Sequence, residues 1–364
     1  MNFRVLLALA LGAAAPALAG AAPAALRAAQ AIAQAADVPA QRIELQTAIA
    51  LGLVQQGQRA EAEKLAAGLP PFQHATVLLA LAEATPAAEF AAAEKLLLAV
   101  QTDRALTTDW HKSRIARGLA VAYARLGRLA PAEALAREVP DTEDRAFALQ
   151  AVVAALSQAG DVARAREVAG TIEENRRYGT YRQKAEALAH VATALHQRGD
   201  PEGAATLLAQ AALLLPKKPG WSDGGALRAV ALAEHACGET AAATTLLTRA
   251  EDLAQAIAGP WKVSELTQVA AAWRRCDQAA RADQRLADAA TFLAAQTVTD
   301  RLPEALTLAR AQFAAGQRDT ARKLLTATLA EVSGLPNPDV SRGPHVSTLL
   351  TWAELFGIES LPTS

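Results

Sequence analysis

Aromatic residues make up only 4% of the 364-residue chain, and methionine occurs once and cysteine twice. The scarcity of aromatic and β-branched runs disfavours β-strands, because those residues are the ones that pack well on a pleated surface. Two cysteines exclude a disulfide-rich scaffold. Neither sign of charge is in excess, since 36 Lys and Arg face 37 Asp and Glu. A general nucleic-acid binder would carry a strong basic excess, so the composition excludes that class.

Alanine supplies much of the 52% hydrophobic content. It is the strongest helix former and lets helices approach closely, but it buries little apolar area per residue. The composition therefore predicts an all-α fold of closely packed helices.

The first residues have the order of a secretory signal peptide. Arg4 supplies a positive charge, residues 5–15 are apolar, Pro16 breaks the run, and Ala17-Leu18-Ala19 offers small residues for cleavage. We predict a signal peptide over residues 1–19, cleaved after Ala19, and a periplasmic or secreted protein; a buried N-terminal helix is the alternative. No later stretch reaches the roughly 18 apolar residues that cross a bilayer, so we expect no transmembrane segment in the mature chain.

A repeated pattern organises most of the chain. We take Gly57 as a register mark, and the same position recurs at intervals of 31, 39, 33, 39, 39, 39 and 39 residues, at Ala88, Gly127, Gly160, Gly199, Gly238, Asp277 and Gly316. Five residues after each mark stands an alanine: Ala62, Ala93, Ala132, Ala165, Ala204, Ala243, Ala282 and Ala321. Glycine ends a helix in the left-handed conformation, and a small residue then lets the next helix pack closely. Each unit is thus predicted to be a helix-turn-helix hairpin, whose apolar face is buried by stacking.

The unit from Leu119-Ala120 through Tyr123, Gly127 and Ala132 to Pro140 resembles the tetratricopeptide (TPR) family. The resemblance implies a right-handed α-solenoid of about eight TPR-like helix-turn-helix repeats over residues 40–332, with helical caps. The family repeat has about 34 residues, whereas most intervals here are longer. We assign residues 20–39 to an N-terminal capping helix and residues 333–364 to a C-terminal loop and capping helix.

The chain lacks the sequence motifs of common enzymes. We find no phosphate-binding glycine loop, no nucleophile elbow and no HExxH pair. We therefore expect no catalysis, no cofactor and no metal, although an active site assembled from distant repeats is an alternative. Charged residues such as Arg164, Arg166 and Glu167 are interpreted as a solvated surface.

Two sets of rarer residues have a place in the repeat. Cys237 and Cys276 should lie on neighbouring helices about 8–10 Å apart, too far for a disulfide, so we predict free thiols.

Trp110, Trp221 and Trp261 stand at the start of first helices. A packing role between units is favoured over an aromatic binding platform, because recurrence at one repeat position is typical of packing.

The first helix of each hairpin is expected to line a concave groove, as the resemblance implies. Three residues before successive marks stand His196, His235 and Arg274, and acids are nearly missing from the neighbouring positions. We predict a locally cationic binding groove, with an ordinary solvated face as the alternative. Its candidate residues are Arg117, Arg125, His190, His196, Arg228, His235, Arg274, Arg275 and Arg310.

The function predicted from these features is that of an exported, non-catalytic interaction scaffold. The partner would be a peptide or protein segment held in the concave groove. Two alternatives stay open: a binder of anionic glycan or cell-wall fragments, and an envelope-polymer hydrolase.

Overall fold

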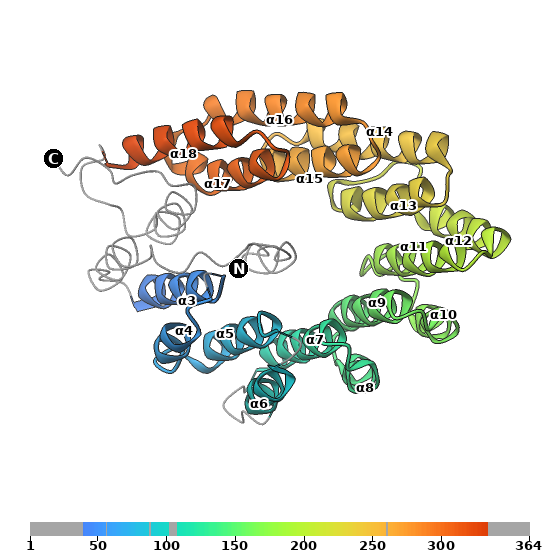
Figure 1. Ribbon diagram of the computed structural model, residues 1–364, viewed down its shortest axis with the longest axis horizontal. Helices are drawn as coiled ribbons and strands as arrows, with labels where there is room; N and C mark the ends of the chain where they lie inside the picture. The colour runs from blue at the N-terminus through green and yellow to red at the C-terminus, as the bar shows by residue number, and fades with distance from the viewer. Residues whose placement is uncertain (1–38, 56, 87–88, 102–107, 260, 334–364) are drawn as a thin grey trace. The chain divides into compact units, whose positions relative to one another are not determined.

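The structure is a computed structural model that describes residues 39–55, 57–86, 89–101, 108–259 and 261–333 (Figure 1). The predicted signal peptide lies outside these ranges, as do almost all of the two predicted capping segments. Throughout the described ranges the regular structure is helical and no strand occurs, so the all-α prediction is confirmed. None of the described helices is long and apolar enough to cross a membrane.

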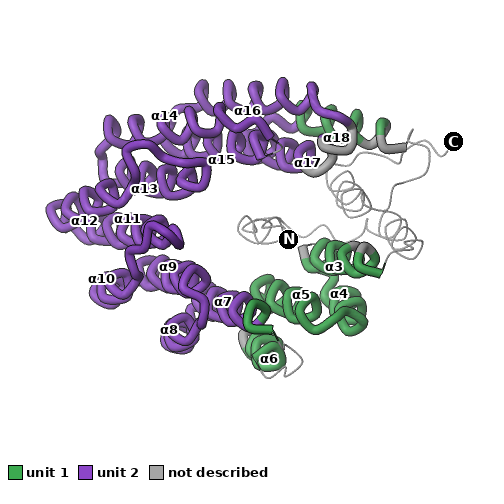
Figure 2. The backbone as a smooth tube through the Cα atoms, turned by 180° about the vertical axis from the view of Figure 1, so that it is seen from behind, with its two compact units in different colours: residues 1–111, 319–364 green, residues 112–318 purple. Residues whose placement is uncertain are grey.

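The chain divides into two compact units, residues 1–111 with 319–364, and residues 112–318 (Figure 2). The described helices that lie mainly in unit 1 are α3 (Pro39–Gln55), α4 (Arg59–Ala66), α5 (Pro71–Glu83), α6 (Phe90–Gln101) and α18 (Arg318–Ser333). Those of unit 2 are α7 (Asp109–Arg125), α8 (Leu129–Glu138), α9 (Thr142–Gln158), α10 (Val162–Thr171), α11 (Tyr181–Gln197), α12 (Pro201–Leu214), the 3-10 helix η3 (Trp221–Asp223), α13 (Gly224–Ala236), α14 (Thr240–Ala256), α15 (Trp261–Arg275), α16 (Ala279–Ala294) and α17 (Val298–Ala314).

Unit 2 is a curved stack of helical hairpins. Its first helices α9, α11, α13, α15 and α17 contact one another in succession and form the inner layer (Figure 1). The second helices α10, α12, α14 and α16 form the outer layer, and each contacts the first helix of the following hairpin. The right-handed sense of the superhelix and the count of eight repeats stay predictions.

The predicted register is confirmed by the backbone. The marks at Gly57, Gly127, Gly160, Gly199, Gly238 and Gly316 have φ between 73° and 90°, and Asp277 has φ 59°. Ala88 lies outside the described residues. The eight alanines that follow the marks are all buried, with at most 1% of their surface exposed. Each turn therefore uses the left-handed conformation, and each second helix packs through a side chain small enough to allow close approach.

We expect Gly199→Ala and Gly52→Ala to have opposite effects on stability. Neither added methyl group meets an atom within 4 Å, so backbone conformation decides both results. Gly199 has φ 82°, where alanine costs about 1–2 kcal/mol. Gly52 lies inside α3, where alanine should add up to about 1 kcal/mol. Urea denaturation of both variants measures the difference, and equal effects would contradict the turn assignment.

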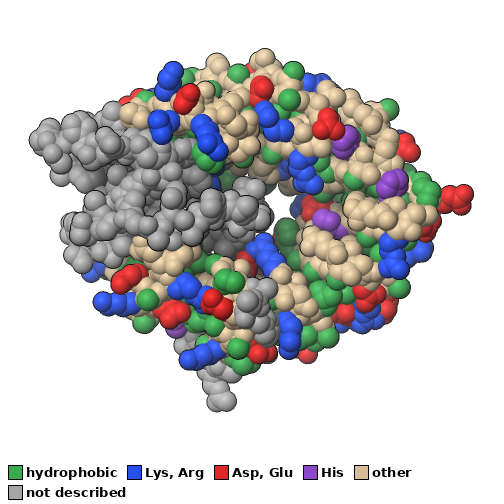
Figure 3. Space-filling view, in the orientation of Figure 1, with side chains coloured by type: hydrophobic (Ala, Val, Ile, Leu, Met, Phe, Trp, Pro, Cys, Tyr) green, Lys and Arg blue, Asp and Glu red, His purple; other side chains and the backbone are tan. Residues whose placement is uncertain are grey.

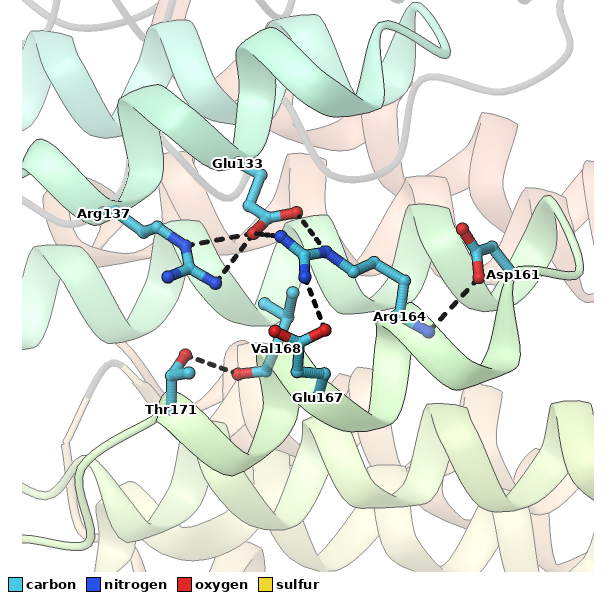
Figure 4. A network of polar contacts seen from close by, with 7 residues as sticks. All are labelled: Glu133, Arg137, Asp161, Arg164, Glu167, Val168 and Thr171. Atoms are coloured by element: carbon cyan, nitrogen blue, oxygen red, sulfur yellow. Dashed lines mark hydrogen bonds and ion pairs between the residues drawn. The ribbon is translucent and has the colours of Figure 1, made fainter.

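A buried carboxylate joins two second helices (Figure 4). Glu133 on α8 is 9% exposed and accepts hydrogen bonds from Arg137 on the same helix and from Arg164 on α10. Arg164 contacts both oxygens, at 3.0 Å from Nε and 2.6 Å from Nη2, and also pairs with Glu167. The interpretation of Arg164 as simply solvated is therefore wrong, because its pairing with Glu133 joins α10 to α8, whereas Glu167 is 59% exposed, as a solvated surface residue should be.

The packing role predicted for three tryptophans is supported for Trp110, whose ring centroid lies 5.3 Å from that of Phe72 on α5, but not for the largely exposed Trp221. Trp110, Trp221 and Trp261 are 44%, 72% and 41% exposed, because they stand at helix starts beside the connecting loops. Trp273 also packs between helices, and it is completely buried. It stands four residues before the mark Asp277, a position filled by buried Leu53, Tyr123 and Leu156 in other repeats.

Candidate binding face

Partly exposed polar residues line the inner layer of unit 2. On α11 they are Arg182, Glu186, His190 and Thr193, spaced three or four residues apart and therefore on one side of the helix. The other sides of α11 are filled mainly by buried alanines and aliphatic residues that pack against the neighbouring helices. We call the polar side of α9, α11, α13 and α15 the inner face.

Three of the predicted groove arginines are paired with carboxylates. Arg117 is 7% exposed and lies 2.9 Å from Asp144 of α9, while Arg228 is 8% exposed and lies 2.6 Å from Glu265 of α15. The third pair is Arg274 with Asp283, at 2.5 Å.

The expectation that acids are nearly missing here is therefore wrong. Two of the partner acids stand on the next first helix, at offsets of 27 and 37 residues from their arginines rather than 39. The sequence prediction compared residues at one equivalent position of each repeat, and these two acids do not stand at that position. The inner face is consequently mixed in charge rather than cationic.

Histidine side chains gather over α11 and α13 (Figure 3). The Nε2 of His190 lies 3.5 Å from the side-chain amide nitrogen of Gln150 on α9. Burial, assisted by the nearby Arg275 charge, lowers the pKa of His190, so its ring is neutral at neutral pH. His235 faces Asp277 at 3.5 Å, and its Nδ1 is buried without a hydrogen-bond partner among the described residues. His196 is half-buried near the end of α11.

The remaining residues of the predicted binding groove are spread along the helices of unit 2. Arg125 and Arg275 are exposed at the last turns of α7 and α15. Arg310 on α17 is half-buried, and burial lowers its pKa. The structure thus brings His190 and Arg275 within electrostatic reach, whereas Arg117 and Arg125 lie on α7, two first helices before α11.

Glu186 is the residue of this face that the sequence interpretation missed. A Cβ atom at Gly225 of α13 would lie 3.7 Å from its Oε1 and 4.0 Å from Nη2 of Arg228. A Cβ atom at Gly224 would lie 3.0 Å from Oε2 of Glu265. The two glycines therefore let both carboxylates approach the start of α13. The sequence feature that could have predicted this site is the pair of adjacent glycines at the start of α13, because glycine is otherwise unfavourable in a helix.

Burial raises the pKa of Glu186 to about 7 from 4.5, against the opposing effect of Arg228 and Arg182. The protonated carboxyl is favoured in the folded chain, so its contribution to stability is complete below about pH 4.5 and is lost as pH rises through 7. We expect Glu186→Gln to remove this loss, making the variant more stable than the parent at pH 8 by on the order of 2 kcal/mol, with little difference near pH 4.5.

Urea denaturation at the two pH values measures this effect. Glu138→Gln, which removes an exposed carboxylate from α8, controls for the change in net charge. A stability difference between Glu186→Gln and the parent that does not change with pH would contradict the prediction.

Cys237 and Cys276 are free thiols, as predicted. Cys276 is 5% exposed, and the Sγ of Cys237 lies 4.0 Å from the carbonyl oxygen of Ala192 on α11. Burial raises the pKa of both thiols, which makes them poor nucleophiles at neutral pH.

Comparison with known proteins gives similarity only at the level of solved structures. No family model matches the chain, and no curated protein matches it. A protein of Podosopora anserina, described as a kinesin light chain with nearly identical TPR-like repeats, is 22% identical over 60% of this chain and 95% of its own, with a TM-score of 0.33. Ton1535 from Thermococcus onnurineus NA1 is 13% identical over 89% of this chain and 95% of its own, with a TM-score of 0.29.

The fold is established by the repeated hairpin itself. Left-handed turns recur at the register marks, and a buried alanine follows each mark five residues later. The first helices of successive hairpins contact one another in unit 2, as stacked helical pairs do. The chain therefore has a tetratricopeptide-like helical repeat fold.

Proposed function

We propose that the chain is an exported, non-catalytic interaction scaffold that binds a peptide or protein segment along the inner face. The observation that carries this proposal is the row of half-buried or buried polar side chains that crosses four consecutive first helices. It runs from Gln150 on α9 through His190 on α11 and Arg228 on α13 to Gln268 on α15. Stacked repeats characteristically bind through such extended surfaces.

The spacing of the helices suits an extended chain. Packed helices lie about 8–10 Å apart, and an extended peptide rises about 3.3 Å per residue, so every third residue would meet the next helix. Glutamine and neutral histidine each offer a donor and an acceptor, which matches a peptide backbone. Because Arg228 and Arg274 are already paired, this face favours a peptide over a strongly anionic glycan.

Binding is tested with the partner that the mature chain retains from periplasmic extract. We expect Gln150→Ala/His190→Ala to weaken its binding by roughly tenfold in calorimetry, because two hydrogen-bonding groups are lost. The two side chains contact each other, so removing both leaves neither without its neighbour. Arg166→Ala on α10 is the control.

A second variant, His196→Ala/His235→Ala/Arg274→Ala, tests the three groove residues predicted near the C-terminal ends of the first helices. Weaker binding here as well would extend the contact to the C-terminal turns of the first helices. Unchanged affinity in both variants, with the fold intact, would refute binding on the inner face.

Export is proposed from residues 1–19 alone. Mass spectrometry of the protein recovered from the periplasm or the medium should find an N-terminus at Gly20. A chain that stays in the cytoplasm with its first residues intact would refute this part of the proposal.

Hydrolysis of an envelope polymer is a second candidate, favoured by the carboxyl pair. Burial raises the pKa of Glu186 to about 7, whereas Glu265 is paired with Arg228 at 2.6 Å. Two carboxyl groups in such different environments can act as general acid and as base. Release of soluble fragments from purified cell wall by the parent, but not by Glu186→Gln, would favour hydrolysis over simple binding.

A further inference from the structure

Exposed apolar and basic side chains gather at the edge of unit 2 where its first helices begin. The connection between α12 and α13 is the centre of this edge. Leu213 and Trp221 at its two ends are 82% and 72% exposed, and Lys217 and Lys218 between them are exposed as well.

The neighbouring connection, between α10 and α11, has a similar composition. Tyr178 is 48% exposed and follows the exposed Arg176 and Arg177. This connection also carries two exposed acids, Glu173 and Glu174. The net positive charge of the edge is therefore concentrated on the α12–α13 connection.

Hydrogen bonds hold these connections side by side. The Tyr181 hydroxyl donates to Asp223 at 2.5 Å, and Arg182 Nη1 donates to Ser222 Oγ at 3.0 Å. From α14, Arg249 donates to the carbonyl oxygen of Pro216 at 2.6 Å. The base of the connection is thus fixed on both sides, while Leu213 and Trp221 stay exposed. We call Leu213, Lys217, Lys218 and Trp221 the aromatic edge.

We propose that the aromatic edge docks the protein on an anionic lipid bilayer. Tryptophan favours the boundary between acyl chains and headgroups, and lysine is attracted to anionic headgroups. Leu213 favours a lipid bilayer over a carbohydrate as the ligand of this edge. Its side chain has neither an aromatic ring that could stack on a sugar nor a group that could form a hydrogen bond with one. A leucine exposed beside a tryptophan matches an acyl environment, and two lysines complement the negative headgroups. In this arrangement the aromatic edge rests on the membrane surface, and the inner face is a separate surface.

Vesicle co-sedimentation of the mature chain, without residues 1–19, tests this proposal. We expect binding to vesicles of phosphatidylcholine mixed with phosphatidylglycerol, and much weaker binding to phosphatidylcholine alone. Lys217→Ser/Lys218→Ser should lower the partition coefficient about tenfold to thirtyfold. Leu213→Ser/Trp221→Ser should lower it about tenfold or more, because buried apolar area is lost.

A control variant removes two exposed positive charges elsewhere. Arg166→Ser/Lys323→Ser should bind the mixed vesicles like the parent. Circular dichroism confirms that each variant keeps its helices. The proposal is overturned if the parent does not bind the mixed vesicles, or if Leu213→Ser/Trp221→Ser binds them as well as the parent. Retention by purified cell-wall glycan without vesicle binding would also overturn it.

Discussion

Asp144→Asn is expected to lower the free energy of unfolding by about 3–5 kcal/mol, because it leaves a buried arginine without its counter-charge. Asp144 and Arg117 are 5% and 7% exposed, and the carboxylate lies 2.9 Å from Nη1 of Arg117. Arg114 adds a second positive charge 3.5 Å from the same oxygen. Burial already lowers the pKa of Arg117, and Asp144 is the largest influence that opposes this shift. Urea denaturation monitored by circular dichroism measures the loss.

Two comparisons isolate the effect of the buried charge. Glu89→Gln breaks the exposed pair with Arg59, whose side chains are 60% and 29% exposed, and should cost less than about 1 kcal/mol. Arg117→Met/Asp144→Asn should recover part of the loss, because the uncompensated buried guanidinium is gone. An equal loss in Asp144→Asn and Glu89→Gln would show that the pair between α7 and α9 does not stabilise the stack.

Trp273→Ala is expected to cost about 3–5 kcal/mol, since it removes a large, completely buried side chain. The indole Nε1 donates to Glu251 of α14 at 2.7 Å, and the guanidinium of Arg281 on α16 lies 4.1 Å from the ring centroid. Glu251 also pairs with Arg285 of α16 at 3.0 Å. The ring therefore fills the space between three helices and completes a polar network at its rim.

Trp273→Phe and Trp221→Ala are the matched comparisons. The first keeps an aromatic ring but loses the hydrogen bond, so we expect a smaller cost than for alanine. The second removes a ring that is 72% exposed and should change stability by less than about 0.5 kcal/mol. A larger loss in Trp221→Ala than in Trp273→Ala would mean that Trp221 packs between units after all.

The sequence by itself determined the hairpin, because its signals act over a few residues. A glycine before a helical run with an alanine five residues later specifies a left-handed turn and a close helix pair, whatever surrounds it. Gly199 and Ala204 behave as this rule requires. Even Asp277, which is not a glycine, adopts φ 59° where the repeat demands it. The free thiols followed in the same way, from a repeat interval and the distance between packed helices.

Only the tertiary structure decided which side chains meet across hairpins. The partners of Arg117 and Arg228 lie 27 and 37 residues ahead, so they depend on how each hairpin is rotated and shifted against the next. The same rotation places the half-buried Glu186 beside the start of α13 and leaves Trp221 exposed. A rotation of this kind is the sum of many small packing contacts rather than of any local propensity. For this reason the sequence predicted a cationic groove, whereas the structure has an inner face of mixed charge. The helices themselves were predicted correctly.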